Sequence, residues 1–250
     1  MSVTSVLARL APVSLEDIVE QAELLIRVDR KYLMARADAE MLVATVPANS
    51  QVLEIAGQRQ FGYRSLYFDP ARLDAYRGTA QRRRRRFKVR TRRYDTGAEF
   101  LEVKTRQASA TVKHRIPSPA SGLDLGVAGT AYVERQLAAA GVELTTALVA
   151  TLWTSYTRST LLLPADSARI TIDTDLCWSS PHHDDRLLAG EVAIVETKSA
   201  GQASSADRLL WSLGHRPVSI SKYGTGLAAL HPGLPSNRWH RLLGNLAVPR

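Results

Sequence analysis

At 250 residues, with 45% hydrophobic and 23% charged residues, the chain has the composition of a globular protein large enough to bury a substantial core. Its one cysteine, Cys177, excludes an internal disulfide framework and a multi-cysteine metal site. The chain has 33 Lys and Arg against 24 Asp and Glu, and nine of the basic residues lie between Arg82 and Arg93, so this segment accounts for the whole net charge of +9. Such a balance favours a polyanionic partner: nucleic acid, a phosphate-rich ligand or an anionic membrane surface.

The N-terminal segment MSVTSVLARLAPVSLEDIVE reaches acidic residues before any long apolar run, which is a poor match to a signal peptide. The most apolar window, residues 136–153, contains Glu143 and several threonines, and it is too short and too polar for a membrane span. We therefore expect a cytoplasmic protein.

The predicted elements mix helices and strands along the whole chain. The expected helices cover residues 14 to about 23, 37–46, a short connection at 70–76, 129 to about 153, and 205–213, which Gly214 caps. The expected strands cover residues 24–34, 51–57, 63–69, 87–94, 99–106, 110–116, 167–178, 187–199 and 217–223. We expect one α+β domain over residues 1–250, with a core of about 24–232 and a peripheral tail beyond Pro232.

Charged residues recur at every second position of these strands, and a strand projects alternate side chains to opposite faces. The shared faces carry Lys88 with Arg90 and Arg92, Glu102 with Lys104 and Arg106, Lys113 with Arg115, and Glu196 with Lys198. One interpretation is an ordinary half-exposed sheet with its charged face in water. Adjacent like charges repel, however, and a closed barrel around a multivalent anion would compensate them.

Two glutamates interrupt these cationic faces. Glu102 and Glu196 each stand in a Glu-x-Lys motif, so the carboxylate and the ammonium group point the same way. Carboxylates among phosphate-binding cations suit Mg²⁺ or Mn²⁺, which take oxygen ligands and share phosphate oxygens. The alternative is that each glutamate simply neutralises its neighbouring lysine.

The ordered series of motifs resembles the VTC-type polyphosphate polymerase domain, within the CYTH or triphosphate tunnel metalloenzyme superfamily. The matching pieces run from Arg27 to Tyr223 and read RVDRKYLM, YRSLYFDP, FKVRTRRY, FLEVKTR, TVKHRI, SYTRSTLL, ARITIDTDL, VETKS and SISKY. The resemblance implies an antiparallel β-barrel of about eight strands, a triphosphate tunnel, with flanking helices. It also implies transfer of the terminal phosphate of ATP onto inorganic polyphosphate with Mn²⁺ or Mg²⁺.

The same resemblance implies individual site residues. The expected phosphate-binding residues are Lys31, Arg64, Arg90, Arg92, Lys104, Lys113 or Arg115, Tyr156, Arg158, Lys198 and Lys222. Among them, the expected catalytic residues are Arg90, Arg92, Lys104, Arg158 and Lys198, and the expected metal ligands are Glu196 and Glu102. The hydrolase branch of the superfamily begins with a Glu-x-Glu-x-Lys strand, which here reads Arg27-Val28-Asp29-Arg30-Lys31 and so favours the polymerase branch.

Two alternatives to a polymerase stay open: a hydrolase of tripolyphosphate or a related triphosphate, and a non-catalytic module that binds polyanions. The expected partners are ATP or another nucleoside triphosphate and inorganic polyphosphate. A specific nucleic acid is not expected, because only Phe87 and Tyr94 flank the basic run. A membrane-protein partner would not be visible in this chain, and the oligomeric state is not predicted. Residues 82–86 do not alternate charged with apolar side chains, so we expect them to be a solvated segment that leads into the strand near a tunnel mouth.

Overall fold

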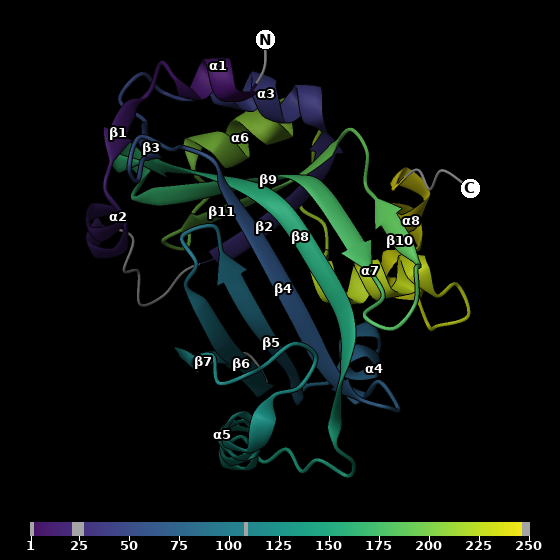
Figure 1. Ribbon diagram of the computed structural model, residues 1–250. Coiled ribbons are helices and arrows are strands. Elements are labelled where there is room, and N and C mark those ends of the chain that lie inside the picture. Colours follow the sequence, from purple (N-terminus) through teal and green to yellow (C-terminus); the bar gives the residue numbers. More distant parts are fainter. Residues whose placement is uncertain (1–2, 22–27, 108–109, 247–250) are drawn as a thin grey trace. The chain divides into compact units, whose positions relative to one another are not determined.

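The computed structural model describes residues 3–21, 28–107 and 110–246 (Figure 1). The chain divides into two compact units. Unit 1 comprises Met1–Gly62, Tyr156–Leu176 and Ala189–Ile220, and unit 2 comprises Tyr63–Ser155, Cys177–Leu188 and Ser221–Arg250. Because the chain passes between the units repeatedly, they are not successive domains, and the expectation of a single domain stays a prediction.

Unit 1 is built on three antiparallel strands with β11 (Val192–Ser199) between β2 (Val28–Ala35) and β9 (Ala168–Ser179). Short strands β1 (Ala11–Val13) and β3 (Gln51–Leu53) pair in parallel, and β3 also pairs with the end of β8 (Leu148–Leu163). The register places Lys31 opposite Glu196 and Lys198 opposite Asp29. Opposed residues of an antiparallel pair share a face, so these four charged residues lie on one face of the sheet.

The other face of the unit 1 strands forms an apolar core. Its strand residues include Tyr32, Ile170, Ile172 and Val195, and they pack with side chains of α1 (Val3–Leu7), α3 (Arg36–Thr45) and α6 (Ser205–Ser212). Figure 1 shows these three helices together beside β2, β9 and β11. Each fully buried side chain of this size contributes about 1.5–3 kcal/mol, so this core fixes which face of the strands is left for charged residues.

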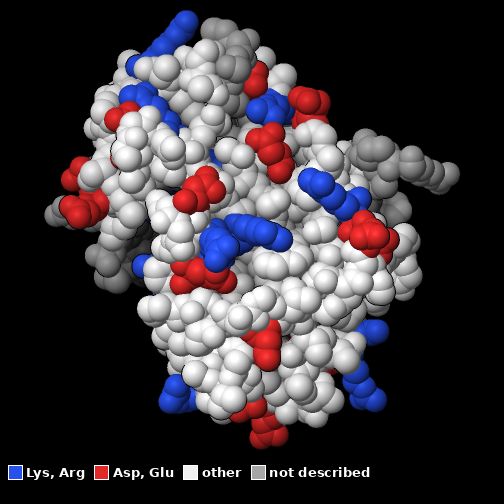
Figure 2. All heavy atoms as spheres, in the orientation of Figure 1, with Lys and Arg blue, Asp and Glu red and all other residues white. Residues whose placement is uncertain are grey.

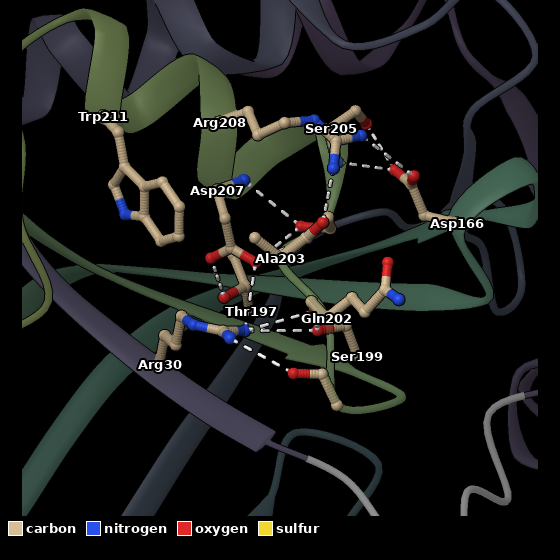
Figure 3. Close-up of polar contacts among 12 residues, drawn as sticks. Arg30, Asp166, Thr197, Ser199, Gln202, Ala203, Ser205, Asp207, Arg208 and Trp211 are labelled. Atoms are coloured by element: carbon tan, nitrogen blue, oxygen red, sulfur yellow. Dashed lines mark hydrogen bonds and ion pairs between the residues drawn. The ribbon is translucent and has the colours of Figure 1, made fainter.

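Asp207 joins α6 to the strands from this core side (Figure 3). Its buried carboxylate accepts hydrogen bonds from the hydroxyl groups of Tyr32 at 2.7 Å and Thr197 at 2.6 Å, and from a backbone amide at the start of α6 at 2.9 Å. Burial alone would raise the pKa of Asp207, but these hydrogen bonds lower it below its ordinary value. Tyr32 and Thr197 adjoin Lys31 and Glu196 in sequence, so the carboxylate braces the strands that carry the charged face.

Unit 2 contains an antiparallel meander. Its strands are β4 (Phe61–Pro70, in this unit from Tyr63), β5 (Arg86–Tyr94), β6 (Glu99–Gln107) and β7 (Ala110–Pro117), paired in that order. The turn between β5 and β6 places Gly97 at φ +85°, which an L side chain rarely adopts. β10 (Arg186–Leu188) pairs with the end of β9. The meander predicted over β5 to β7 is therefore confirmed.

The odd-numbered residues of β5 and β6 form the apolar face of the meander, and the even-numbered residues of β4 and β7 lie opposite them. Val89, Leu101 and Val103 are fully buried, α5 (Gly126–Ala139) packs against β6, and α4 (Asp74–Ala80) packs against β5. Lys88, Arg90 and Arg92 alternate with these buried positions, so the parity expected from the sequence is confirmed.

Three predicted elements are wrong. Residues 148–153 belong to strand β8, because α5 ends at Ala139 and Gly141 follows at φ +63°. The expected strand 187–199 is two strands, β10 and β11, separated by Gly190 at φ +34°. The expected strand 217–223 is instead the approach to helix α7 (Lys222–Leu230), whose N-cap Ser221 accepts a hydrogen bond from the amide of Gly224 at 3.1 Å.

The first helix and the tail also differ from expectation. α2 covers Leu15–Gln21, whereas the rest of that predicted helix, the start of the predicted strand 24–34 and Arg27 lie outside the described residues. Beyond Pro232 the chain forms α8 (His240–Asn245) and buries Trp239, so residues 233–246 are not peripheral.

The α+β class with mainly antiparallel strands and flanking helices is confirmed. Within each unit the described strands form an open sheet, so neither unit closes into a barrel by itself. Among the described residues, every helix is too short or too polar to cross a bilayer.

Gly226→Ala is expected to destabilise the protein by about 3 kcal/mol or more, because a Cβ at this helical position would lie 2.0 Å from the Trp178 ring. Denaturant unfolding measures the change. The control Gly244→Ala in α8 meets nothing within 4 Å and should be neutral or stabilising by up to about 1 kcal/mol. Similar losses in both variants would contradict the tight packing of α7 on Trp178.

Candidate functional site

Glu196 is the centre of the charged face in unit 1. The ammonium groups of Lys31 and Lys198 lie 2.5 and 3.1 Å from the same carboxylate oxygen, Oε1, and Lys198 also lies 3.3 Å from Asp29. Burial alone would raise the pKa of Glu196, but Lys31, Lys198 and Arg158 lower it well below its ordinary value. Glu196 is therefore an ionised carboxylate flanked by lysines. We call Asp29, Lys31, Tyr156, Arg158, Asp173, Glu196 and Lys198 the unit 1 face.

Arg158 is held rigidly on the unit 1 face. Its Nε and Nη2 donate to the two carboxylate oxygens of Asp173 at 2.6 and 2.8 Å, and its guanidinium lies 5.2 Å from the centre of the Tyr156 ring. Such a fork fixes the plane of the guanidinium. Beside Glu196, the cross-strand residue Thr171 has a buried hydroxyl without a hydrogen-bond partner among the described residues. A polar atom of this kind is costly to bury unless a ligand satisfies it.

Unit 2 carries a second charged face, centred on Glu102. The register aligns Arg90, Glu102 and Arg115 in one row and Lys88, Lys104 and Lys113 in the next. We call these six residues together with Arg92 the unit 2 face. Because opposed and diagonal neighbours lie within side-chain reach, six cations surround one carboxylate on this face.

The carboxylate of Glu102 organises its neighbours. Its Oε2 lies 2.6 Å from Arg90, its Oε1 lies 2.5 Å from Lys113, and Arg92 Nε is 4.0 Å away. Burial alone would raise the pKa of Glu102, but Arg90, Arg92 and Lys113 lower it to about 2. The pKa of Lys113 is lowered, mainly by burial and also by the charges of Arg90 and Arg92, although Glu102 acts to raise it.

Other side chains brace the unit 2 face. Tyr67 accepts a hydrogen bond from Arg90 Nη1 at 2.9 Å and stacks on Tyr223, with 4.9 Å between the ring centres. Lys88 donates to the hydroxyl of Ser221 at 2.7 Å, next to Lys222 at the first position of α7. Tyr67, Ser221 and Asp173 have no role that the sequence alone indicates, because only the tertiary structure shows which residues they contact.

Two predicted phosphate-binding residues are placed differently from expectation. Arg64 is paired in register with Arg93, on the opposite face of the meander from Arg90, and its guanidinium lies 4.1 Å from the centre of the Trp153 ring. Arg115 stacks over Phe100 at 5.0 Å, whereas Lys113 makes the ion pair with Glu102. The geometry therefore favours Lys113 over Arg115 as the residue that shares the carboxylate.

The two predicted metal ligands differ in their surroundings. Glu102 divides its two oxygens between Arg90 and Lys113, whereas Glu196 receives both lysines on Oε1 and has the hydroxyl of Thr171 as a cross-strand neighbour. Within the described part of the chain, His, Cys, Asp and Glu form no group of three that would hold a metal by themselves. A hard cation at Glu196 would therefore need oxygen ligands from a phosphate, which is the way Mg²⁺ commonly binds.

Another buried carboxylate, that of Asp69, lies near Tyr67 and Tyr223. Asp69 accepts hydrogen bonds from the amides of Ala75 and Tyr76 at 2.8 and 2.9 Å and from the hydroxyl of Tyr223. Burial raises the pKa of Asp69 to about 6 from 3.8, although these hydrogen bonds oppose the shift. The folded state therefore holds this proton more tightly than the unfolded chain.

The free energy of unfolding is expected to fall by up to about 3 kcal/mol as the pH rises from about 4 to about 6, because the unfolded chain releases the Asp69 proton first. Glu102 and Glu196 have lowered pKa values, so their stabilising contributions are lost only at more acid pH. Chemical unfolding at a series of pH values measures the slope in this window. Asp69→Asn should remove that slope, and an unchanged slope in the variant would contradict the assignment.

Basic and acidic side chains are interspersed on the face of the protein drawn in Figure 2. The fold and the two cationic faces define an α+β protein equipped to bind multivalent anions. A family model described as VTC domain matches residues 26–231, and the chain belongs to this family. That membership supports a function related to polyphosphate or triphosphate.

No curated protein matches the chain. Among solved structures, one match is a Hippeastrum protein described as a putative adenylyl cyclase, HpAC1, with a dominant triphosphatase activity. It has 14% sequence identity and a TM-score of 0.47, and the match covers 85% of this chain and 100% of the other. At this level of similarity we draw no conclusion from it.

Proposed function

We propose that the protein is a metal-dependent phosphotransferase of the polyphosphate polymerase type. In this reaction the terminal phosphate of ATP, or of another nucleoside triphosphate, is transferred to inorganic polyphosphate. The observation that carries the proposal is the cluster of Lys31, Glu196 and Lys198, in which an ionised carboxylate lies between two lysines on a face that also holds Arg158.

Phosphoryl transfer depends on alignment of the reactants and on compensation of the charge on the transferring group. The unit 1 face supplies compact charge from Lys31 and Lys198 and a fixed guanidinium from Arg158, which Asp173 orients. Considered by itself, the unit 2 face carries Arg90, held by Glu102 and Tyr67, and it also carries Arg92, Lys104 and Lys113 as candidate phosphate ligands. Preorganised cations of this kind stabilise developing negative charge without first having to reorient.

Glu196 would hold Mn²⁺ or Mg²⁺, with the hydroxyl of Thr171 beside it. When bound, the metal would neutralise charge on phosphate oxygens and polarise the group under attack. Because Lys31 and Lys198 also contact the carboxylate, metal and triphosphate are expected to bind together, with the lysines turning towards phosphate oxygens. We assign Glu102 to the positioning of Arg90 and Lys113 rather than to the metal.

The test is incubation of the purified protein with ATP and Mn²⁺, followed by analysis of phosphate products by gel electrophoresis and of released orthophosphate. Long-chain polyphosphate would support the proposal. Orthophosphate as the sole product would assign the chain to triphosphate hydrolysis. Retained binding of tripolyphosphate without turnover would make it a binding module.

A further inference from the structure

The basic run at residues 82–86 is not a disordered arm. Arg86 is the first residue of β5 and is paired in register with Arg106 of β6. Arg86 and Arg106 lie two residues from Lys88 and Lys104, so their side chains project from the same face of the sheet. They extend the unit 2 face by one more row, about 7 Å along the strands. The Arg86 guanidinium donates to the carbonyl of Arg83 at 2.7 Å, which folds the run back onto the strand.

Two more arginines meet at the adjacent end of helix α4. Arg238, from the segment before α8, donates from Nη1 to the carbonyl of Thr79 at 2.7 Å, and the amide of Arg82 donates to the same carbonyl at 3.3 Å. Thr79 lies in the last turn of α4, so one helix end gathers residues that are 156 positions apart in sequence. Tertiary structure, and not the basic run alone, therefore builds this cluster.

Arg86 and Arg238 both respond to the positive charge of their neighbours in this cluster. The pKa of Arg86 is lowered, mainly by burial and also by the charge of Arg106. The pKa of Arg238 is lowered as well, mainly by burial and also by the charges of Arg86, Arg82 and Arg106. Like charges gathered at one place disfavour the folded state unless an anion binds among them.

The backbone at Arg82 is a further observation. Arg82 has φ +56°, just after the C-terminus of α4, where a left-handed residue is normally glycine. An arginine here costs conformational energy that glycine would avoid. Glycine at position 82 would therefore suit the backbone better than the arginine found there.

We propose that Arg82, Arg86, Arg106 and Arg238 form a second anion-binding subsite, which binds the phosphates of a long inorganic polyphosphate chain beyond those held by the unit 2 face. This inference rests on the proposed function and extends it to the recognition of chain length. The rows from Arg92 to Arg86 span about 20 Å along β5, which exceeds what a triphosphate needs. A single-stranded nucleic acid is a poorer fit, because Phe87, the aromatic residue next to Arg86, is buried and offers no stacking platform.

The experiment compares Arg82→Gly/Arg106→Gln with the control Arg83→Gln/Arg84→Gln, which removes the same charge from exposed positions outside the cluster. Binding of tripolyphosphate, long-chain polyphosphate and a single-stranded oligonucleotide is measured without metal at several salt concentrations. We expect the cluster variant to lose about tenfold or more in affinity for long chains, with a smaller salt dependence, and to keep its affinity for tripolyphosphate. The control should change each affinity by less than about twofold.

Equal losses in the two variants would overturn the subsite, as would a loss of tripolyphosphate binding or a loss confined to the oligonucleotide. If the wild-type protein bound neither tripolyphosphate nor long-chain polyphosphate, both the subsite and the proposed function would be wrong. If the wild-type protein bound both ligands and the cluster variant bound them equally well, only the subsite would be wrong. Arg82→Gly by itself keeps the test independent of folding, because glycine suits this backbone and the variant should unfold at the same temperature or higher. It should still weaken long-chain binding.

Discussion

Glu196→Gln is expected to lower metal-dependent phosphate transfer from ATP by at least about 100-fold while the protein stays folded. The substitution keeps the shape of the side chain but removes the negative charge that would hold a divalent cation. Lys31 and Lys198 then lose the carboxylate that they share through Oε1. Their charge becomes more available to phosphate, so binding of tripolyphosphate without metal should be equal to or tighter than that of the wild-type protein.

Product analysis with Mn²⁺ and calorimetric binding without metal separate these two effects. Glu16→Gln is the matched control, because Glu16 is an exposed residue of α2 and should leave both measurements unchanged. Intact turnover in the Glu196 variant would exclude Glu196 as the metal ligand. A loss of metal-free binding would instead indicate that Glu196 acts by holding the lysines in place.

Arg90→Ala/Arg92→Ala should weaken tripolyphosphate binding by at least about 100-fold, because each arginine contributes a charge-assisted contact of about 1.5–3 kcal/mol. The same change removes two of the three cations that lower the pKa of Glu102. The pKa of Glu102 should therefore rise, and the buried carboxylate should cost the folded state about 2–4 kcal/mol. Titration calorimetry and denaturant unfolding measure the two losses.

A third substitution separates binding from folding. Adding Glu102→Gln to the double variant removes a buried charge that has lost two of its three cationic partners, so stability should recover while tripolyphosphate binding stays weak. Arg93→Ala is the control on the same strand, since Arg93 is exposed on the opposite face and pairs with Glu99 at 3.2 Å. Strong binding by the double variant, or recovery of binding in the triple variant, would contradict the role of the two arginines.

Local periodicity explains why much of the fold could be predicted. The meander, its turn and the parity of Lys88, Arg90 and Arg92 follow from alternation within short segments. The same reasoning failed at residues 148–153, where a short apolar run fits a helix or a strand equally well. It failed again at 217–223, because Ser221 caps a helix whose small residues leave room for Trp178 and Trp239.

By itself, the sequence determined the strand faces of the meander, the Glu-x-Lys pairs and the family resemblance, because these depend on residues close together in the chain. Only the tertiary structure decided which charges meet. Strand register placed Arg64 on the opposite face of the meander from Arg90 and Lys113 beside Glu102. Packing of the folded chain placed Arg158 beside Asp173 and Arg238 beside the basic run. Such pairings depend on strand register and on helix packing, which are set by burial summed over the whole core rather than by any local pattern.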